Sequence, residues 1–436
     1  MIVKNEEATL AHCLESVKTI VDEMIIVDTG STDKTIDIAR GFGAQVHPFK
    51  WCDDFAAARN ESLKHCKGDW VLILDGDDAV DPLDYGTIKN ACLHPFADAY
   101  ELIYRNYMYT SAVRTHDIGA VPNKPDNPGK PAYGEGRNLP FYADSTALRL
   151  ARMFNGLAFS DRIHETLGKS LVSHGKTIKT LDAVIHHYGK LFNDRLAYNA
   201  QYYLTLARRE ADENPTDIMA QFNLLQQALV AGKWDLALEA ARANLKLGSF
   251  KSAFVLYGAG VALQQLERHI EAIRYFDMLL DQNPDHVLAV LAKGVSSETV
   301  GDINAGRELI MKAMEMRPDY MPVHCSLAML ELRLNNFDVA RRTILDALKI
   351  APDEPDLYDL LVKIETFRGD QQQAARDAML GLQNCPNGTK GLWYRLVAVH
   401  LLQTGERETA KSMLESGLKA FPDDPSLARI KNLIFG

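Results

Sequence analysis

A repeated spacing in the second half of the chain restricts its fold more than any other feature of the sequence. Prolines that follow helical segments recur at intervals of 34, 34, 34 and 36 residues. They are Pro284, Pro318, Pro352, Pro386 and Pro422. Small residues expected at the tight contact of two helices keep the same period, and they are Ala237, Ala272, Gly306, Ala340, Ala374 and Ala410. Two registers with one period predict a stack of helix pairs.

This period is typical of the tetratricopeptide repeat. From Pro215 onward we expect about six helix pairs, closed by residues 423–436 as a terminal cap, so that residues 215–436 form an all-α solenoid. Residues 191–214 are expected to form a linking helix. The concave face of such a solenoid can hold a peptide or protein, and a rigid platform or a homodimer surface is the alternative.

Composition and charge exclude several functional classes. The 436 residues, 47% of them apolar, suffice for two or three globular domains. A net charge of -10 without a Lys/Arg tract argues against nucleic acid or an anionic membrane as partner. No window approaches the ~18 consecutive apolar residues of a membrane span. Six cysteines without zinc-type or CxxC spacing indicate reduced thiols, so we expect a soluble cytoplasmic protein.

Residues 1–190 alternate between apolar runs and helical patterns. The runs at 24–27 and 70–74 have the length of strands buried on both faces, and residues 53–66 are typical of a helix opened by Asp. This order predicts a Rossmann-like α/β domain with a largely parallel sheet, whose ligands bind at the carboxyl ends of the strands. Three further strands are expected at 99–110, 147–154 and 177–189.

A stretch rich in Pro and Gly separates the first two of these later strands. Residues 110–145 are longer than an ordinary connection in a compact domain. We expect a flexible loop on the acceptor side of a site, with plain disorder as the alternative.

The string "IIVDTGSTD" at residues 25–33 has two interpretations. Aspartic proteases carry Asp-Thr-Gly-Ser at the end of an apolar strand, but their paired carboxylates require a second copy, and none is present. Helical patterns precede and follow the string. The motif is therefore expected in a strand-to-helix turn, with Asp28 at the strand end. Ser31, Thr32 and Asp33 are expected to be helix caps, with contact to a ligand as the alternative.

Three carboxylates follow the second strand in "WVLILDGDDAVDP". Asp75, Asp77 and Asp78 repel one another, which is usually tolerated where a divalent cation neutralises them. Helix capping by Asp75 and Asp77 and solvation of Asp78 stay open, and Asp81 before Pro82 is expected to be an N-cap. A calcium EF-hand is excluded because the Gly at its sixth position and its closing Glu are missing.

Four strings, in this order, carry a family resemblance: "MIVKNEE", "VDTGSTDKT", "WCDDFAAARNESLKHCKGDWVLILDGDD" and "RIHETL". Together they resemble family 2 glycosyltransferases of the GT-A fold, of the bacterial kind with a tetratricopeptide tail that includes peptide S-glycosyltransferases. The resemblance implies transfer of a hexose from a nucleotide diphosphate sugar, usually a UDP sugar, with inversion at the anomeric carbon. The chain begins within what resembles the first strand, which leaves open whether its natural start lies upstream. Relatives often have Asp-Ala-Asp-Glu where this chain has Asp-Gly-Asp-Asp.

The resemblance and the turn chemistry together indicate a donor site. By resemblance, Asn5 and Glu6 line the base pocket. Asp28 could accept hydrogen bonds from uracil or ribose, and a glycine turn lets backbone amides approach the nucleotide. Arg59 could reach the pyrophosphate or orient Asp75, and a plain salt bridge is the alternative. The residues assigned to donor binding are Asn5, Glu6, Asp28, Gly30, Arg59, Asn60, Asp75 and Gly76.

A bound Mg²⁺ or Mn²⁺ is expected because it would stabilise the charge that grows on the departing diphosphate. Asp77 is the expected first ligand, and Asp75 either ligates as well or holds the ribose or a metal-bound water. In GT-A enzymes a third ligand is often a His late in the domain. His187 at a strand end is the candidate, His164 the competitor, and His186 should face the opposite side by strand alternation. A structural role for His187 stays open.

An inverting transferase needs a base on the face opposite the diphosphate. Glu165 in "SDRIHETL" is the expected base, because its position matches an acidic residue in relatives of this type. Asp161 is the alternate base. Pairing of Glu165 with Arg162, or capping of a short helix, is the structural alternative.

These inferences predict an inverting hexosyltransferase that uses UDP-glucose or UDP-N-acetylglucosamine. The acceptor is expected to be a peptide or protein side chain, because the solenoid offers an extended groove. Two alternatives stay open: a saccharide or cell-envelope acceptor, and a repeat scaffold that binds a nucleotide without turnover. The sequence fixes neither the sugar, nor the acceptor atom, nor the oligomeric state.

Overall fold

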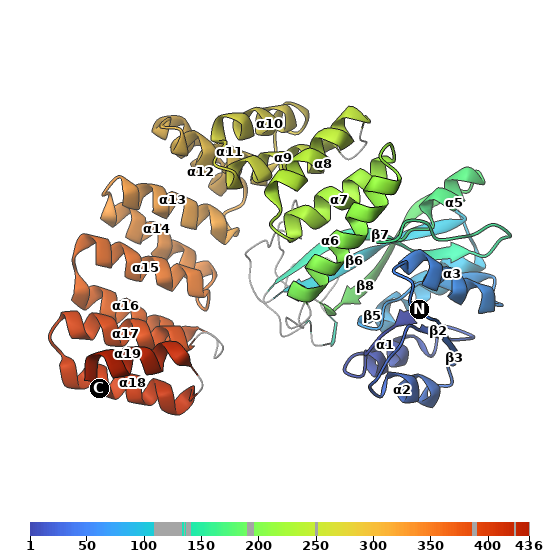
Figure 1. Cartoon of the computed structure of the whole chain (residues 1–436), viewed down its shortest axis with the longest axis horizontal. Helices are drawn as coiled ribbons and strands as arrows, with labels where there is room; N and C mark the ends of the chain where they lie inside the picture. Colours follow the sequence, from blue (N-terminus) through green and yellow to red (C-terminus); the bar gives the residue numbers. More distant parts are fainter. Residues whose placement is uncertain are drawn as a thin grey trace. The chain divides into compact units, whose positions relative to one another are not determined.

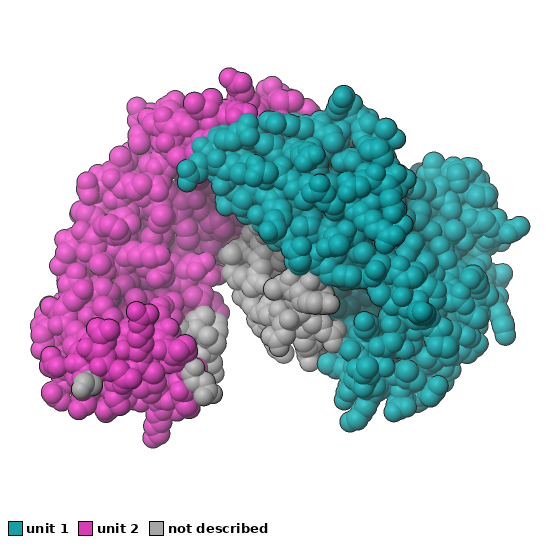
Figure 2. Space-filling view, viewed as in Figure 1, with its two compact units in different colours: residues 1–268 teal, residues 269–436 magenta. Residues whose placement is uncertain are grey.

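The structure is a computed structural model that describes residues 1–108, 133–134, 136, 141–189, 196–248, 252–385, 390–422 and 424–435. It divides into two compact units, Met1–Arg268 and His269–Gly436 (Figures 1 and 2). Most of the loop expected at 110–145 lies outside the described residues, as does Pro386, while residues 141–145 belong to a strand. The domain boundaries expected at 190 and 214 stay predictions.

The first unit opens with a three-stranded parallel sheet in the order β1-β2-β3. Its strands are β1 (Ile2–Val3), β2 (Ile25–Asp28) and β3 (Gln45–Pro48). Two helices connect them, α1 (Leu10–Val17) and α2 (Thr35–Gly41). All of β2 is buried, as its continuous apolar run predicts. Its last residue, Asp28, pairs with Val3 of β1 and Pro48 of β3.

A second sheet has five strands in the order β4-β7-β6-β8-β5. The strands are β4 (Trp70–Leu72), β5 (Asp78–Val80), β6 (Ala99–Met108), β7 (Phe141–Arg152) and β8 (Ile178–His187). Here the expectation of a largely parallel sheet is wrong, because only β6 and β8 pair in parallel. Met108 pairs with Phe141, so the chain leaves β6 and enters β7 at the same end, which requires an antiparallel pair.

Short helices complete the sheet region, and two of them start at the predicted Asp caps. They are α3 (Phe55–His65), the 3₁₀ turn η1 (Pro82–Asp84), α4 (Tyr85–Leu93) and α5 (Gly168–Ser173). Asp54 accepts the amide of Ala57 at 2.8 Å and opens α3. Asp81 accepts the amide of Leu83 at 2.9 Å directly before Pro82, which confirms it as an N-cap.

The core between α1 and the second sheet fixes the ends of the strands. Cys13 and Val17 of α1 pack with Tyr100, Leu150 and Ile185 in one buried cluster. Dense packing of this kind leaves little freedom to the strands, so residues at the ends of β5 and β8 keep a defined position.

Four helices follow the sheets within the first unit: α6 (Leu196–Glu213), α7 (Ile218–Val230), α8 (Trp234–Lys246) and α9 (Ser252–Gln265). The helix expected at 191–214 is observed as α6. Asp217 accepts the amides of Met219 and Ala220 and thereby opens α7. Further along, α7 packs on α8 and α8 on α9.

The second unit contains helices and no strand among its described residues. Its helices are α10 (His269–Gln282), α11 (Val287–Thr299), α12 (Ile303–Met316), α13 (Met321–Arg333), α14 (Phe337–Ile350), α15 (Pro355–Arg368), α16 (Gln371–Asn384), α17 (Lys390–Gln403), α18 (Arg407–Ala420) and α19 (Pro425–Phe435). Alternate helices from α7 to α19 begin 34 to 36 residues apart, which confirms the tetratricopeptide-type solenoid. A Cβ on Gly306 would lie 2.9 Å from the Gly294 carbonyl oxygen, so the small residue there permits close helix packing.

Within the described part of the chain, no helix combines the length and apolarity needed to cross a lipid bilayer.

Candidate active site

The turn after β2 is pinned by two polar side chains. The buried carboxylate of Asp28 accepts the amides of Gly30 at 3.1 Å and Ser31 at 3.2 Å, and Gly30 has a φ of 110° that favours glycine. Asn5 accepts the amide of Thr32 at 2.7 Å through Oδ1. The motif therefore forms the expected strand-to-helix turn, while the nucleotide contacts assigned to Asn5, Asp28 and Gly30 stay predictions.

Gly76 brings the acidic segment close to the first strand. A Cβ at this position would lie 2.8 Å from Cγ of Glu6, so only glycine fits without displacing that side chain. Glu6 in turn accepts a hydrogen bond from the Thr9 hydroxyl at 3.1 Å. Two motifs that are distant in sequence, around Glu6 and Gly76, thus meet at one place.

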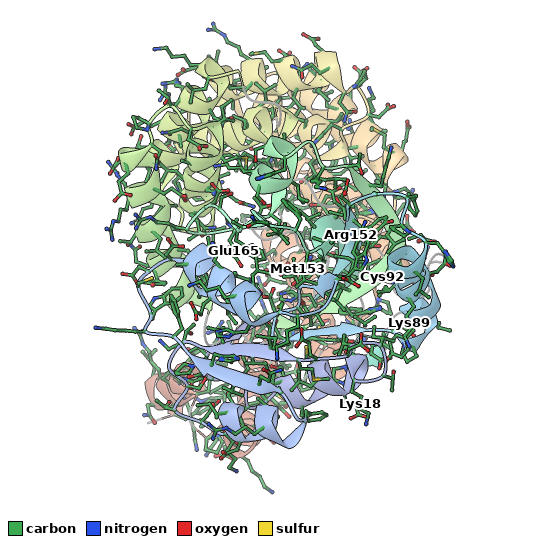
Figure 3. The ribbon with its side chains drawn as sticks, turned by 90° about the vertical axis from the view of Figure 1, so that its right-hand side faces the viewer. Lys18, Lys89, Cys92, Arg152, Met153 and Glu165 are labelled. Atoms are coloured by element: carbon green, nitrogen blue, oxygen red, sulfur yellow. The ribbon has the colours of Figure 1, made fainter. Side chains whose placement is uncertain are left out.

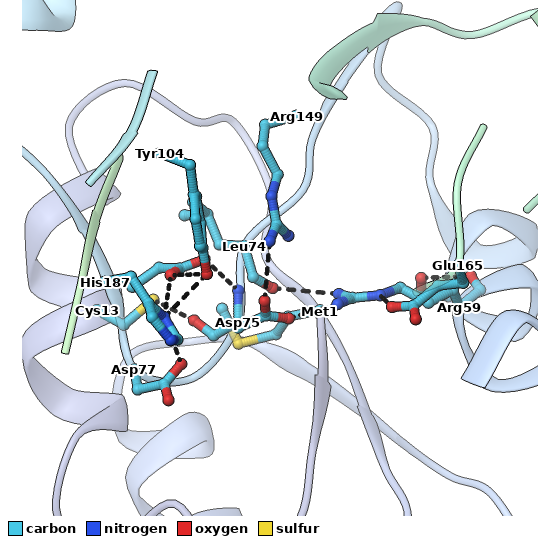
Figure 4. A network of polar contacts seen from close by, with 12 residues as sticks. Met1, Cys13, Arg59, Leu74, Asp75, Asp77, Tyr104, Arg149, Glu165 and His187 are labelled. Atoms are coloured by element: carbon cyan, nitrogen blue, oxygen red, sulfur yellow. Dashed lines mark hydrogen bonds and ion pairs between the residues drawn. The ribbon is translucent and has the colours of Figure 1, made fainter. Parts of the chain in front are cut away.

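Asp75 is held by two arginines (Figure 4). Nη2 of Arg59 donates to Oδ1 of Asp75, and Nη2 of Arg149 donates to Oδ2 at 3.1 Å. Burial alone would raise the pKa of the Asp75 carboxyl, but the charges of Arg59 and Arg149 hold it well below its usual range. Asp75 is therefore a fixed anion, and its predicted contact with a ribose or a metal-bound water stays a prediction.

Asp77, Asp78 and His187 form the one group of potential metal ligands found among the described residues. The pairing of β5 with β8 places Asp78 opposite His187, so the strand register joins two segments 109 residues apart. Nδ1 of His187 lies 3.5 Å from Oδ1 of Asp77 and 3.1 Å from Oδ1 of Asp78. Asp75 and His164, the other predicted ligands, are not part of this group.

Gly189 leaves space beside this group. A Cβ there would lie 2.2 Å from Oδ2 of Asp77 and 2.9 Å from Nε2 of His187, so both atoms border one small volume that a side chain would fill. A carboxylate oxygen and an imidazole nitrogen are donors that Mn²⁺ accepts in proteins, and Mg²⁺ accepts the carboxylate. The residues present therefore fit a divalent cation.

His187 is oriented through its other ring nitrogen. Nδ1 lies 2.9 Å from the Tyr104 hydroxyl, which donates to Oδ1 of Asp78 at 2.8 Å. Metal-binding histidines are commonly fixed by such a carboxylate partner. Burial lowers the pKa of His187, but Asp77 and Asp78 outweigh it, so the pKa is raised.

The carboxylates of Asp77 and Asp78 differ in burial and in hydrogen bonding. Burial and the charges of Asp78 and Asp75 raise the pKa of Asp77 to about 7, although His187 opposes this rise. Asp78 is fully buried and accepts the amide of Asp75 at 2.8 Å through Oδ2. Solvation of Asp78, one of the sequence-based alternatives, is therefore wrong. Asp78 therefore stabilises the structure of the group, and Asp77 supplies the carboxylate that solvent can reach.

Strand alternation correctly separates the two neighbouring histidines. His186 is buried, and its Nδ1 lies 2.7 Å from the Tyr107 hydroxyl, away from the partners of His187. His164 lies elsewhere, with Nε2 at 2.8 Å from the Gln227 amide nitrogen on α7.

Glu165, labelled beside α3 in Figure 3, accepts Nε of Arg59 at 2.7 Å. The alternative pairing with Arg162 is not observed, since Arg162 contacts Glu213 at 2.7 Å instead. Asp161, the alternate base, accepts Nζ of Lys169 at 2.6 Å, and its side chain is 5% exposed. The two candidate bases therefore have different cationic partners.

The side chain of Asn60 forms hydrogen bonds with the segment that leads to Glu165. Nδ2 of Asn60 donates a hydrogen bond to the backbone carbonyl of Phe159 at 3.0 Å. Oδ1 of Asn60 accepts a hydrogen bond from the backbone N–H of Phe159 at 2.7 Å. The donor contact expected for Asn60 stays a prediction, and the observed contacts give it a positioning role.

Sequence reasoning missed four residues of this site. Arg149 and Tyr104 come from β7 and β6, and the Arg149 guanidinium lies 4.6 Å from the Tyr104 ring centroid. Tyr203 of α6 packs on Phe55, and their ring centroids lie 5.6 Å apart. Burial and the charges of Glu165 and Asp75 raise the pKa of Tyr203 to about 12. Gly189 follows His187 by two residues. The charged Arg149 within an apolar strand pattern was the one available sequence signal.

Comparison with known families decides the class of the N-terminal domain. Residues 1–155 match the family model described as Glycosyl transferase family 2, which spans β1 to β7 and all three carboxylates after β4. Residues 1–155 form a family 2 glycosyltransferase domain. This family 2 domain contains Asp75, Asp77 and Arg59, while Glu165 and His187 follow it in sequence.

Relatives resemble this chain over short stretches. A tetratricopeptide repeat-containing protein of Synechococcus elongatus is 50% identical over 78 residues, which cover 18% of this chain and 19% of that protein. The prophage-derived glycosyltransferase SunS of Bacillus subtilis is 34% identical over 90 residues, 20% of this chain and 21% of SunS. The chain thus spans about a fifth of these relatives. A tetratricopeptide repeat protein from Parabacteroides merdae aligns with 19% identity and a TM-score of 0.40, covering 55% of this chain and 93% of that one.

Proposed function

We propose that this chain is a metal-dependent, inverting glycosyltransferase that moves a hexose from a UDP sugar to a peptide or protein side chain. One observation carries the proposal. The segment Asp75–Asp78 holds the metal-ligand group at one end, through Asp77 and Asp78, and the Arg59–Glu165 ion pair at the other, through Asp75. The cation site and the candidate base thus share one support, Asp75–Asp78, which lies inside the family 2 glycosyltransferase domain.

Asp77 and His187 would hold Mg²⁺ or Mn²⁺ in the space beside Gly189. Such a cation, when bound, stabilises the negative charge that grows on the departing diphosphate. Asp78 and Tyr104 keep the imidazole of His187 in position, with its Nε2 directed at that space. Asp75 contributes no proton chemistry, because its two arginine partners keep it ionised.

Glu165 would act as the base. The acceptor forms a bond to the anomeric carbon while the bond from that carbon to the diphosphate breaks, UDP leaves with the electron pair, and the acceptor's proton passes to the Glu165 carboxylate. Arg59 holds this carboxylate at 2.7 Å, so its free oxygen has a restricted direction. The half-buried Tyr203 hydroxyl stays protonated near neutral pH, because its pKa is about 12.

The solenoid supports a peptide or protein acceptor. Repeat arrays of this kind present extended surfaces that commonly hold peptide segments. UDP-glucose and UDP-N-acetylglucosamine are the proposed donors. Incubation with Mn²⁺ and peptides that contain Cys or Ser should give, by mass spectrometry, peptides with one added hexose from UDP-glucose or one added N-acetylhexosamine from UDP-N-acetylglucosamine.

Release of UDP from each donor tests the enzymatic part of the proposal, because water is itself a hydroxyl acceptor. The full-length protein should release UDP in Mn²⁺ and lose this activity in EDTA. Asp77→Asn should lose it as well, whereas Asp37→Asn, a change of an exposed carboxylate on α2, should not. Tight UDP binding without turnover of either donor would instead support a nucleotide-binding scaffold.

A further inference from the structure

The candidate base lies on a small hairpin that is held from two sides. Ser160 and Thr166 exchange two backbone hydrogen bonds of 3.0 Å, which close residues 160–166 into what we call the base hairpin. Inside it, Asp161 has a φ of 73° and His164 a φ of 53°. Non-glycine residues in this region of φ need support from their surroundings, so contacts to the hairpin bear directly on the position of Glu165.

The first side is α3. The amide of Phe55 donates to the carbonyl of Arg162 at 3.0 Å, and Arg59 contacts Glu165 directly. Asn60 holds Phe159 immediately before the hairpin. These contacts come from the glycosyltransferase domain itself.

The second side is α6 and α7, which come after the sheets. Glu210 of α6 accepts the amide of Arg162 at 3.0 Å, and Asn223 of α7 donates to the carbonyl of Ile163 at 3.3 Å. Both side chains are buried, with exposed fractions of 7% and 1%. The backbones of two consecutive hairpin residues, Arg162 and Ile163, are therefore held by buried polar side chains.

Side chains of the hairpin contact the same two helices. Gln227 of α7 lies 2.8 Å from Nε2 of His164, the residue directly before Glu165. Nζ of Lys169 donates to Oδ1 of Asp161 at 2.6 Å and to Oδ2 of Asp217, the N-cap of α7, at 3.0 Å. Each of Asp161, Arg162, Ile163 and His164 thus has a partner in or bound to α6 or α7.

We propose that α6 and the first repeat helix α7 are part of the catalytic apparatus: Glu210, Asn223 and Gln227 are positioning residues that set the place of Glu165. This inference rests on the proposed role of Glu165 as base. A carboxylate that must meet an acceptor proton tolerates little displacement, since a shift of ~1 Å can cost on the order of 100-fold in rate. Helices that serve only as a docking surface would affect stability without acting through Glu165.

The test uses the full chain, UDP-glucose and Mn²⁺, with UDP release as the readout. Glu210→Ala removes the acceptor for the Arg162 amide, and Glu210→Gln keeps an oxygen at the same place. Gln227→Leu removes the contact to His164 with little change in volume, which provides an independent variant should Glu210→Ala fold poorly. Arg208→Ala, on the exposed face of α6, is the matched control.

We expect Glu210→Ala and Gln227→Leu to lower kcat about 10-fold or more while the KM for UDP-glucose changes less than about twofold. Glu210→Gln and Arg208→Ala should stay near wild type. Because the effect passes through Glu165, adding Gln227→Leu to Glu165→Gln should cause almost no further loss.

Three results separate the possible failures. Wild-type kcat in Gln227→Leu overturns the positioning inference, and so does a full additional loss in the double variant. Wild-type turnover by Glu165→Gln alone overturns the base assignment of the proposed function instead.

Discussion

Arg59 and Glu165 form a partly buried ion pair with 2.7 Å between Nε and Oε1, although 106 residues separate them in the sequence. The same guanidinium contacts Asp75, so one cation joins the acidic segment to the base hairpin (Figure 4). Arg59 is therefore the geometric link between the two halves of the candidate site.

Replacing Arg59 should damage both stability and turnover. Arg59→Ala leaves Asp75 with one arginine partner and Glu165 without this cation. Breaking a fully buried pair typically costs roughly 3–5 kcal/mol, and the partial exposure of these two carboxylates lowers that cost. Urea denaturation should show this loss. Arg59→Lys keeps the charge but not the planar fork that reaches two carboxylates, so we expect a folded protein with a strongly reduced kcat. Equal kcat for Arg59→Lys and wild type would show that the fork is dispensable.

Gly189→Ala should prevent metal binding. The added methyl would lie 2.2 Å from Oδ2 of Asp77, in the space assigned to the cation. Isothermal titration with Mn²⁺ should show loss of the site, while thermal stability falls little because Gly189 is partly exposed. Gly86→Ala is the control, since a Cβ there meets no atom within 4 Å. Unchanged Mn²⁺ affinity in Gly189→Ala would move the cation away from Asp77 and His187.

Asp77 and Asp78 should respond differently to the same change. Asp78→Asn alters a fully buried acceptor of the Asp75 amide and the Tyr104 hydroxyl, so we expect it to cost roughly 1–3 kcal/mol of stability. Asp77→Asn should abolish Mn²⁺ binding without such a cost, because burial and the neighbouring carboxylates raise the pKa of Asp77 and disfavour its charged form. Thermal unfolding and Mn²⁺ titration of both variants separate the two roles. A loss of stability in Asp77→Asn as large as that in Asp78→Asn would contradict this division.

Shortening the chain should show where the catalytic part ends. A chain ending at Arg268 keeps the whole first compact unit, including α6 and α7. It should still release UDP from UDP-glucose and should lose transfer to a peptide if the repeats recruit that peptide. A chain ending at Asn214 lacks Asn223 and Gln227 and should lose UDP release as well. Full hydrolysis by this shorter chain would confine the catalytic part to the sheets and α6.

Local patterns made most of the fold predictable. The spacing of small residues such as Gly306 indicated the repeats, and the run before Asp28 indicated the buried strand β2. The run at 70–74 was also expected to be a strand buried on both faces, but it forms only the three-residue strand β4, which is half-buried. The parallel sheet was overpredicted, because the pairing of Met108 with Phe141 depends on a long connection whose path no local pattern specifies. Strand direction is set there by tertiary contacts.

The candidate site was predictable where one motif carried it. The acidic cluster indicated a cation site at Asp77, and the family resemblance together with a strand end indicated His187. The structure brings the two residues into one group, and metal binding by them stays a prediction. The partners of Asp75 and Glu165 were not predictable. Arg149 lies 74 residues from Asp75 and reaches it only through the pairing of β4 with β7, which no spacing rule reveals. Gly189 has meaning only once His187 and Asp77 are in place.

The hydrolysis rate of Glu165→Gln in Mn²⁺ tests the central claim most directly, because it separates donor binding from proton removal. The amide keeps the size of the side chain but cannot accept the proton of an attacking hydroxyl. We predict unchanged affinity for UDP-glucose and Mn²⁺, and UDP release lowered roughly 100-fold or more. With a thiol peptide as acceptor the loss should be smaller at raised pH, since part of a cysteine with a pKa of roughly 8.5 is already ionised. Near-wild-type hydrolysis by this variant, with donor and metal bound normally, would contradict the account.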